Sequence, residues 1–373
     1  MKICYLNHDL KPNTGAGRFG LSLLKEMELA WPGLEMAVVT SEPSGDSREV
    51  FSIKPGKIGL IFSVFKIRRV FRDCGIIHAL DGWPYGFAAA LASLGLKKKL
   101  VITAIGSGAV APLYDFFKRS LVVWAYHRAN AVTAISRNTR REILKVVPDL
   151  AIRVINHGVD FEKFQRPVPV PLADSLRPYI LSVGVLKPRK GYEHSIKAFA
   201  EMAADFPGLN YVIFGSDYAP GQKEYRRLRN IAEKLGVGSR VIFLTYDEKR
   251  GLAGRRLTDE ELAYLFRQAE LFTLLPQDVN KDLEGFGLVF LEAAASGLAV
   301  VATKETSAED AVLDGRNGIL APPGDYLAAA AAIKKILSDP ALKADFSRAS
   351  VEFAKKMSWQ KTAGEYAAVY REL

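Results

Sequence analysis

Residues 271–303 read LFTLLPQDVNKDLEGFGLVFLEAAASGLAVVAT, an order of runs that predicts a strand, a loop, a helix and a second strand. The apolar run 271–276 has the length of a buried strand, and a polar loop follows it. A helix is expected to begin near Gly287, Gly297 marks the turn that ends it, and 299–303 forms the next strand. A strand–helix–strand crossover of this length joins parallel strands, with the helix covering one face of the sheet.

The chain on either side of this stretch repeats the alternation of strands and helices. Four prolines crowd into residues 167–178, which is typical of an extended linker. The apolar runs that predict strands lie before the linker and after it, at 2–8, 35–40, 75–80, 99–105, 131–136 and 152–156, and again at 179–184, 211–215, 240–245, 271–276, 299–303 and 317–321. Short strands alternating with helices predict parallel sheets covered on both faces, so the fold class is α/β with two doubly wound domains.

These signals divide the chain into four parts. The first domain is expected at 1–166, the linker at 167–178 and the second domain at 179–357, and a helix over 358–373 is expected to pack back on the first domain. Ligands of doubly wound sheets bind beyond the carboxyl ends of the strands. The site is therefore expected in a cleft between the two domains.

Composition narrows the function classes. The chain has 373 residues, enough for two domains, and its 49% apolar and 25% charged residues are ordinary for a globular protein. Two cysteines make no disulfide framework, and neither a signal peptide nor an apolar run long enough to cross a membrane is visible, so a cytoplasmic location is expected. The net charge of +10 favours polyanionic partners, although a plain surface excess of lysine explains it equally well.

Residues 184–191, GVLKPRKG, follow the first strand of the second domain and place Lys187, Arg189 and Lys190 in one short loop. A bound diphosphate needs its charge balanced by a metal on acidic ligands or by fixed cations. The sequence contains no D-x-D pair, so fixed cations are the favoured solution and no metal is expected. The alternative is an ordinary solvated basic turn.

Residues 14–20, TGAGRFG, contain a literal G-x-G-x-x-G at Gly15, Gly17 and Gly20. A dinucleotide fingerprint requires its first glycine almost directly after a strand. Here the eight residues Asp9 through Ala16 separate the strand end from Gly17. We therefore interpret the segment as a flexible loop that closes over a diphosphate bound by the other domain, and not as a dehydrogenase motif.

Glu284 and Glu292 lie eight positions apart in the opening stretch. Glu284 stands in a loop at the carboxyl end of a strand, where Gly285 and Gly287 let backbone approach a ligand closely. The helix that begins near Gly287 offers free N–H groups to a phosphate or sugar oxygen, and Glu292 lies about one and a half turns into it. A surface glutamate with a local partner is the alternative for each residue alone.

Together these motifs resemble the retaining, GT-B-fold glycosyltransferases usually called family 4, and the similarity runs along nearly the whole chain. It covers the glycine segment, VINHGVDFEKF at 154–164, GVLKPRKG, the two glutamates with the tail EAAASGLAVVAT, and GRNGILAPPGD. The resemblance implies two Rossmann-like domains that face each other across a cleft, with the acceptor on the first domain and a nucleotide sugar on the second.

The resemblance also implies roles for individual residues. Arg189 and Lys190 would bind the donor's diphosphate, Glu284 the donor sugar and Glu292 the ribose hydroxyls. The remaining donor contacts would come from Gly15, Gly17, Gly184, Thr245, Tyr246, Gly285, Phe286, Gly287 and Leu288. Catalysis in such enzymes is described as front-face: the acceptor hydroxyl attacks on the leaving group's side and a phosphate oxygen takes its proton. Electrostatic stabilisation of the leaving diphosphate would then dominate, without a cofactor or a metal.

This chain departs from the family pattern at two positions. Val185 stands where the family often has arginine, and Arg189 is expected to supply that guanidinium. Ile105 stands before Gly106 where the family often has a histidine beside the donor sugar. Gly106 is itself expected on the acceptor side, and the alternatives to that histidine there are His78, Asp81 and Ser107.

Two segments mix aromatic with basic residues. Residues 111–128, APLYDFFKRSLVVWAYHR, read as one helix have a broad apolar surface, and residues 58–73 interleave phenylalanines with lysine and arginine. Such faces suit the surface of an anionic bilayer, and partly buried helices of a two-domain protein explain them as well. The hypothesis is peripheral attachment to the inner face of the cytoplasmic membrane, with a lipid-linked or cell-envelope glycan as acceptor.

The favoured function is a retaining hexosyltransferase that uses a nucleotide sugar. A phosphorylase or epimerase on the same fold is one alternative. A non-catalytic glycan- or membrane-binding homologue is another, motivated by Ile105. Nucleic-acid binding is the weakest reading, because the basic residues form no known module.

Overall fold

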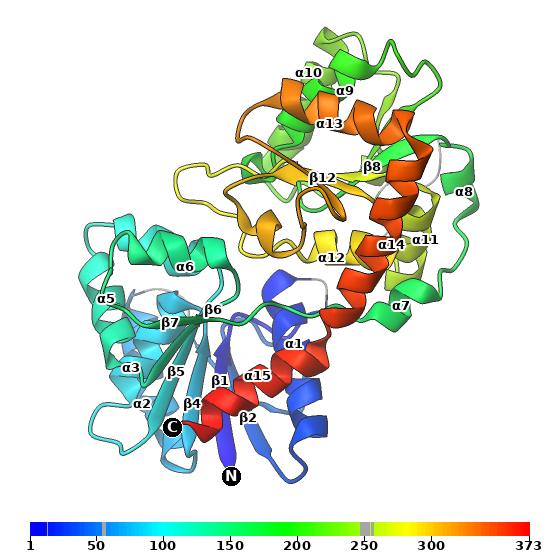
Figure 1. Ribbon diagram of the computed structural model, residues 1–373. Coiled ribbons are helices and arrows are strands. Elements are labelled where there is room, and N and C mark those ends of the chain that lie inside the picture. The colour runs from blue at the N-terminus through cyan, green and yellow to red at the C-terminus, as the bar shows by residue number, and fades with distance from the viewer. Residues whose placement is uncertain (13, 54–56, 247–253, 255–256) are drawn as a thin grey trace. The chain divides into compact units, whose positions relative to one another are not determined.

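Two parallel sheets organise the chain in this computed structural model, which describes residues 1–12, 14–53, 57–246, 254 and 257–373 (Figure 1). Each sheet is the centre of one unit. Unit 1 contains Met1–Gly158, Asn280–Phe286 and Trp359–Leu373, and unit 2 contains Val159–Val279 and Gly287–Ser358. The predicted class, α/β with two doubly wound domains, is confirmed.

In unit 1 the strands of the sheet follow the order β3-β2-β1-β4-β5-β6-β7. Their bounds are β1 Lys2–Asn7, β2 Glu35–Thr40, β3 Glu49–Ser52, β4 Ile76–Leu80, β5 Lys99–Ala104, β6 Ala131–Ala134 and β7 Ile152–Val154. Every pairing is parallel; Ile3, for example, lies opposite Met36 on one side and Ile76 on the other. The order reverses between β1 and β4, so the loops after these two strands flank the crevice in which doubly wound sheets bind ligands.

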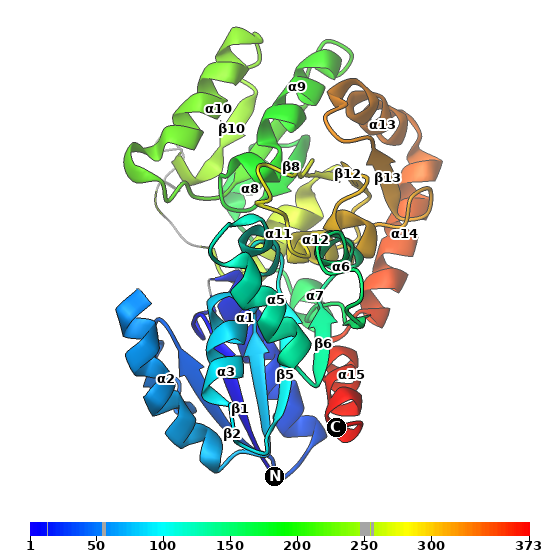
Figure 2. The ribbon, with the colours of Figure 1, turned by 90° about the vertical axis from the view of Figure 1, so that its left-hand side faces the viewer.

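Helices cover both faces of this sheet. Helices α1 (Gly15–Ala30) and α15 (Trp359–Arg371) pack together on one face through a shared apolar cluster (Figure 1). On the other face lie α2 Lys57–Arg72, α3 Phe87–Ala92, α4 Ser107–Val110, α5 Arg119–Arg128 and α6 Arg137–Leu144 (Figure 2). The C-terminal helix thus belongs to unit 1.

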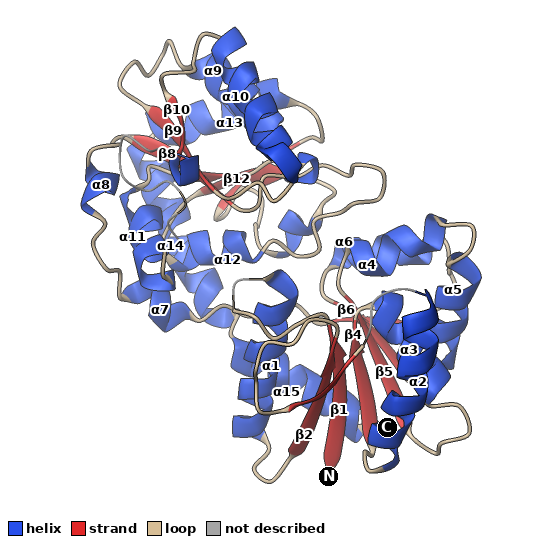
Figure 3. Ribbon diagram, turned by 180° about the vertical axis from the view of Figure 1, so that it is seen from behind, coloured by secondary structure: helices blue, strands red, loops and turns tan. Residues whose placement is uncertain are grey.

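In unit 2 the order of strands is β10-β9-β8-β11-β12-β13, again all parallel. Figure 3 shows β10, β9, β8 and β12 of this sheet from behind. The bounds are β8 Tyr179–Val183, β9 Asn210–Phe214, β10 Val241–Phe243, β11 Phe272–Thr273, β12 Val300–Thr303 and β13 Gly318–Ala321. The helices are α7 Phe161–Gln165, α8 Pro171–Asp174, α9 Tyr192–Met202, α10 Lys223–Lys234, α11 Asp259–Gln268, α12 Leu288–Ala295, α13 Tyr326–Ser338 and α14 Pro340–Lys356. Here the order reverses between β8 and β11, so the loops after these strands flank the second crevice.

The structure corrects two expectations. The edge strand β3 has no counterpart among the predicted strands; it is four residues long and pairs irregularly with β2. The segment 111–128 is not one helix. A 3-10 turn over Ala111–Tyr114 comes first, and α5 begins only at Arg119. Asp115 causes the break, because its Oδ1 accepts hydrogen bonds from the backbone N–H groups of Phe117 and Lys118, 3.0 Å away in each case.

A polar network holds α15 to the sheet of unit 1. His78 on β4 is fully buried, with Nδ1 2.6 Å from the Tyr370 hydroxyl and Nε2 2.7 Å from Oγ1 of Thr103. Thr103 Oγ1 also lies 3.2 Å from the Tyr366 hydroxyl, and the Tyr370 hydroxyl lies 3.3 Å from that of Tyr5. Because every member is paired, the network fixes the docking position of α15.

This burial predicts a loss of stability in acid. Burial lowers the pKa of His78 to about 3, whereas a histidine in the unfolded chain titrates near 6.5. Between these pH values the unfolded state binds one more proton at this position, so His78 alone should lower the free energy of unfolding by about 1.4 kcal/mol per pH unit as the pH drops below 6.5. Urea titrations between pH 7 and pH 4 measure it. In the variant His78→Gln, the change in the free energy of unfolding with pH should be smaller by the contribution of one proton. The same pH dependence in the variant and the unmodified chain would show that His78 does not titrate in this way.

Candidate functional site

The loop after β8 lies at the point where the strand order of unit 2 reverses. It ends in a 3-10 turn over Pro188–Lys190, and Gly191, with a φ of +69°, begins α9. A Cβ on Gly191 would lie 1.6 Å from the carbonyl oxygen of Leu275, in the segment after β11. Only glycine fits there, so the two loops that flank the crevice are locked together.

Lys190 is embedded in this junction. Its side chain is only 7% exposed, and Nζ lies 3.5 Å from the place that a Cβ on Gly184 would occupy. The Tyr192 hydroxyl donates to the carbonyl oxygen of Gly184 at 2.6 Å. The backbone N–H of Gln277 donates to the carbonyl oxygen of Arg189 at 2.9 Å. Lys187, by contrast, is exposed. A fixed, partly desolvated ammonium at the end of a parallel strand suits an anionic ligand.

Thr245 and Tyr246 lie in a 3-10 turn directly after β10. Thr245 Oγ1 accepts a hydrogen bond from the backbone N–H of Gly215 at 3.1 Å. The Tyr246 hydroxyl accepts one from the backbone N–H of Asp217 at 2.6 Å. A Cβ on Gly215 would lie 1.8 Å from the carbonyl oxygen of Gly184. The structure therefore places these predicted donor residues at the same sheet edge as the basic loop, where their side chains support the loop after β9.

Helix α12 begins at Leu288, as predicted, with Gly287 at its N-cap in the left-handed region at φ +77°. Glu292 lies on this helix and is buried. The segment before the helix belongs to the other unit. Asn280–Phe286, which carries Glu284, belongs to unit 1, so the two glutamates belong to different units.

Contacts from Ser107, Thr139 and His157 hold this Glu284 segment, Asn280–Phe286, within unit 1. Ser107 Oγ lies 2.6 Å from Asp282 Oδ1, to which it donates, and it accepts from the N–H of Leu283 at 3.0 Å. Thr139 Oγ1 donates to the carbonyl oxygen of Gly285 at 3.4 Å. The Phe286 ring lies 5.1 Å from the ring of the buried His157, which also stacks on Phe19. Ser107 therefore acts as an anchor for the loop that presents Glu284.

Gly106 makes the closest approach to the same segment. It has a φ of +87°, and a Cβ there would lie 2.6 Å from the Cα of Gly285. Two glycines in direct contact let backbone lie against backbone. This contact explains why a glycine, and no larger residue, follows Ile105.

Asp81 lies next to this contact, at the end of β4. Its Oδ1 accepts from the N–H of Gly82 at 2.7 Å, and Oδ2 lies 1.9 Å from the place that a Cβ on Gly108 would occupy. Burial raises the pKa of Asp81 to about 7, and hydrogen bonds from the backbone of Gly82 and Ile105 oppose this shift only in part. A carboxyl group of this kind exchanges a proton readily with a bound hydroxyl near neutral pH.

His78 is not part of this edge. Both of its ring nitrogens are bonded inside the core, and the side chain is fully buried. The structure therefore argues against the alternative in which His78 contacts a sugar, and the prediction that Asp81 and Ser107 lie on the acceptor side stays a prediction.

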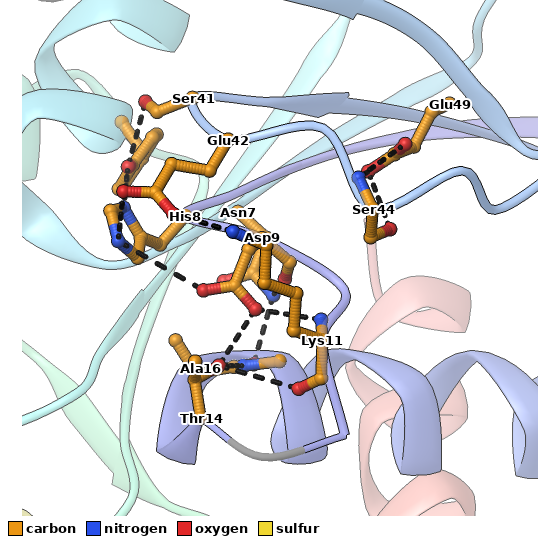
Figure 4. A network of polar contacts seen from close by, with 12 residues as sticks. Asn7, His8, Asp9, Lys11, Thr14, Ala16, Ser41, Glu42, Ser44 and Glu49 are labelled. Atoms are coloured by element: carbon orange, nitrogen blue, oxygen red, sulfur yellow. Dashed lines mark hydrogen bonds and ion pairs between the residues drawn. The ribbon is translucent and has the colours of Figure 1, made fainter.

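The glycines at 15 and 17 are not in a free loop. Both lie in the first turn of α1, which Thr14 caps by accepting from the N–H of Gly17 at 2.9 Å (Figure 4). A Cβ on Gly17 would lie 2.1 Å from the carbonyl oxygen of Lys11 and 2.3 Å from Asp9 Oδ1. The expectation of a flexible loop is thus wrong, because Gly17 is required for the loop after β1 to fold against the helix. No atom lies within 4 Å of the place that a Cβ on Gly15 would occupy.

Figure 4 also shows polar residues that were not among the predicted site residues, such as His8, Ser41 and Glu42. His8 Nδ1 lies 3.0 Å from the Tyr85 hydroxyl, which donates to Ser41 Oγ at 2.9 Å. Glu42 Oε1 lies 3.7 Å from His8 Nε2, and its other oxygen binds Lys11 Nζ at 2.7 Å. These side chains follow β1, β2 and β4 at the crevice of unit 1. The rule that polar residues directly after parallel strands face the ligand would have found His8.

Within the described ranges no group of three or more histidine, cysteine, aspartate or glutamate side chains is arranged to hold a metal ion.

Two family models match the chain. The one described as Glycosyl transferases group 1 matches residues 168–353, and the one described as Glycosyltransferase Family 4 matches residues 14–163. The chain belongs to the GT-B glycosyltransferases of group 1. The resemblance stated from the sequence is confirmed.

Curated relatives of this GT-B chain are about 30% identical to it over part of its length. A D-inositol 3-phosphate glycosyltransferase of Acidothermus cellulolyticus is 31% identical over 233 residues, 61% of this chain and 48% of the relative. A GDP-mannose-dependent alpha-(1-6)-phosphatidylinositol monomannoside mannosyltransferase of Mycolicibacterium smegmatis is 30% identical over 224 residues, 57% and 54% of the two chains. The matched part spans about half the length of each relative.

Solved structures show that the GT-B fold extends over the whole chain. Anabaena HepE in complex with UDP and glucose has a TM-score of 0.78 at 21% identity and covers 100% of both chains. Sucrose-phosphate synthase from Thermosynechococcus elongatus has a TM-score of 0.79 at 20% identity and covers 100% of this chain and 98% of its own. At these identities the likeness concerns the fold alone.

Proposed function

We propose that this chain is a retaining glycosyltransferase that moves a hexose from a nucleotide-diphosphate donor to a hydroxyl acceptor. The observation that carries the proposal is the buried Lys190 at the strand-order reversal of unit 2. The matched relatives are glycosyltransferases by name, one of them dependent on GDP-mannose, and the HepE structure contains UDP and glucose. These names favour a nucleotide sugar as donor.

The donor would bind mainly at the sheet edge of unit 2. Lys190 and Arg189 would balance the diphosphate charge, Glu292 would bind the ribose hydroxyls, and Thr245 and Tyr246 would lie beside the base. Because fixed cations take the leaving charge, the reaction would need no metal, in keeping with a sequence that has no D-x-D pair.

The acceptor would bind at the sheet edge of unit 1. Glu284 would contact the transferred sugar, while Gly106 and Ser107 hold the segment that presents it. Asp81 would bind the acceptor hydroxyl and share its proton. In a front-face reaction the departing phosphate oxygen takes that proton finally, and the new bond forms on the face that the diphosphate leaves.

The finer parts of the proposal concern acceptor and location. We propose a lipid-linked or cell-envelope glycan as acceptor and a cytoplasmic protein that attaches to the inner face of the cytoplasmic membrane. The alternative, a homologue without transfer activity, is motivated by Ile105 at the position where related chains often carry histidine.

Donor binding is tested by thermal unfolding with UDP, GDP and ADP and their sugars, because a ligand of the folded state raises Tm. One nucleotide should raise it, and Glu292→Gln should weaken that nucleotide's binding about tenfold by removing a charge-assisted hydrogen bond. Glu201→Gln, on the exposed side of α9 in the same unit, is the control. Equal effects of the two variants would remove Glu292 from the site.

Transfer is tested with the nucleotide sugar so identified. NMR of the product should show the anomeric configuration of the donor, and chelation with EDTA should leave the rate unchanged. Binding without hydrolysis or transfer would support the non-catalytic alternative, and an inverted product would overturn the retaining mechanism.

A further inference from the structure

A cavity of about 720 Å³ lies within unit 2, at the amino edge of its sheet. Its lining includes Arg177, Glu270 and Ala299, which come one or two residues before β8, β11 and β12. These three strands are neighbours in the sheet, so the three residues lie close together. The proposed donor site lies at the opposite edge, and the five residues of β8 separate the two edges by about 17 Å. This amino-edge cavity is therefore distinct from the donor site.

Three cations and one acid line the amino-edge cavity. Lys343, in the first turn of α14, forms an ion pair with Glu270. In the part of the chain that the structure describes, neither Arg177 nor Arg267 is paired with a carboxylate. The lining thus carries an excess of two positive charges, which an anionic ligand would balance.

Neutral groups hold the Arg267 guanidinium in place at this cavity. Its Nε donates to the carbonyl oxygen of Phe164 at 3.2 Å, and its Nη2 donates to Oε1 of Gln165 at 2.9 Å. Nε2 of Gln165 in turn donates to the carbonyl oxygen of Ala295 at 2.7 Å. These partners orient the guanidinium without cancelling its charge. Nη1 makes no hydrogen bond with a described residue, so its two N–H groups can bind a ligand.

The end of α12 lines the cavity, and the carbonyl groups at the end of a helix ordinarily repel an anion. Here these carbonyls already have partners. Gly297, with a φ of +80°, donates its N–H to the carbonyl oxygen of Ala294 at 3.0 Å, and Gln165 takes that of Ala295. The first turn of α14, which packs against α12 and also lines the cavity, adds the positive end of a helix (Figure 1). An anion would therefore meet capped carbonyls and unbalanced cations.

We propose that this cavity binds a small organic phosphate, with Arg177 and Arg267 on the phosphate oxygens. A guanidinium presents paired N–H groups that match two oxygens of a phosphate. A phosphate monoester carries about 1.5 to 2 negative charges near neutral pH, close to the excess charge of the lining, whereas a single carboxylate would balance only part of it. The volume of the cavity is within the usual range of small-molecule sites, about 300–1,000 Å³, and leaves room for the organic part of the ester.

Other anions fit this cavity less well. A nucleic acid needs cations along a track of phosphates, whereas Arg177, Arg267 and Lys343 converge on one cavity. The diphosphate of a donor is proposed to bind Lys190, at the opposite edge of the sheet. A separate phosphate compound would occupy the amino-edge cavity whether or not the chain transfers a sugar, so this site is independent of the proposed function.

The test is isothermal titration calorimetry of the full-length chain with ribose 5-phosphate, inorganic phosphate and acetate at one ionic strength. Both phosphates should bind, and acetate should bind more weakly because it carries less charge. Arg267→Gln should weaken phosphate binding about tenfold or more, the effect of losing a charge-assisted hydrogen bond. Arg177→Gln should do the same and leave Tm unchanged, because this exposed side chain has no partner among the described residues.

Arg348→Gln is the matched control, because Arg348 is an exposed arginine of α14 in the same unit, paired with Asp345. This variant and Lys190→Ala should both bind the phosphates like the unmodified chain. Loss of binding in Lys190→Ala would place the phosphates at the donor loop, and equal losses in Arg267→Gln and Arg348→Gln would indicate general attraction by net charge. Either result would overturn the proposal, as would an unmodified chain that binds neither phosphate or binds acetate equally well.

Discussion

Replacing Lys190 with alanine should lower kcat/KM for sugar transfer by about a hundredfold or more, the usual cost of removing one preorganised group that stabilises charge in a transition state. Lys190 is 7% exposed, and its Nζ lies 3.5 Å from the place that a Cβ would occupy on Gly184, the glycine that follows β8, so its desolvation and orientation are already part of the folded state. A leaving diphosphate gains negative charge as the glycosidic bond breaks. Without Lys190, only the other groups of the loop would stabilise the charge of the leaving diphosphate. A hundredfold fall in kcat/KM corresponds to about 2.7 kcal/mol of lost transition-state stabilisation.

Lys187→Ala provides the matched control. Lys187 lies in the same loop with the same charge, but its side chain is exposed, so water screens it and its removal should change the rate by less than about threefold. Thermal unfolding of both variants shows whether the loop is intact. A Lys190 variant that folds and keeps its activity would place the diphosphate elsewhere, and equal losses in both variants would point to general attraction by net charge.

Gly106→Ala should have the largest effect on unit 1. A Cβ at this position would lie 2.6 Å from the Cα of Gly285, and neither partner is a side chain that can turn away. The added methyl should push the Glu284 segment off its anchors on Ser107 and Thr139. We expect a loss of about 2–4 kcal/mol in the free energy of unfolding, as for overpacking plus a strained φ, and loss of transfer activity.

Gly95→Ala separates the clash from the backbone strain. Gly95 has a φ of +69°, close to that of Gly106, but its nearest atom to a Cβ is the Arg68 Nη2 at 3.8 Å. This variant should lose only about 1 kcal/mol, the cost of a non-glycine residue in the left-handed region. Urea unfolding and hydrogen exchange of residues 280–286 measure the two effects. Unchanged protection of that segment in Gly106→Ala would show that the contact does not hold it.

The sequence predicted the strands that are buried on both faces, because such strands are short runs of apolar residues. β8, with every residue buried, is an example. It missed β3, whose residues are only partly buried at the sheet edge and carry no such run. It misread 111–128 as one helix, because aromatic residues of an exposed turn look like the apolar face of a helix. The hydrogen bonds of Asp115 that break the helix leave no periodic signal.

The same limits apply to the candidate site. The glycines and charges of GVLKPRKG indicate an anion loop from sequence alone, yet only packing separates the buried Lys190 from the exposed Lys187. Likewise, His78 looks like any polar residue at a strand end until its two buried partners are known. Which unit holds Glu284 depends on contact between two glycines 179 positions apart in the chain, and no local pattern encodes such a contact.

The division of the two glutamates between units matters for anyone who wishes to exchange donor specificity between related enzymes. A chimera cut only at the proline-rich segment would bring a foreign 280–286 segment along with the new donor unit, and that segment would have to fit the host's Gly106, Ser107 and Thr139. The boundaries of the units call instead for junctions at 158/159, 279/280, 286/287 and 358/359. The seven residues that carry Glu284 should therefore be inherited from the parent that supplies the acceptor half.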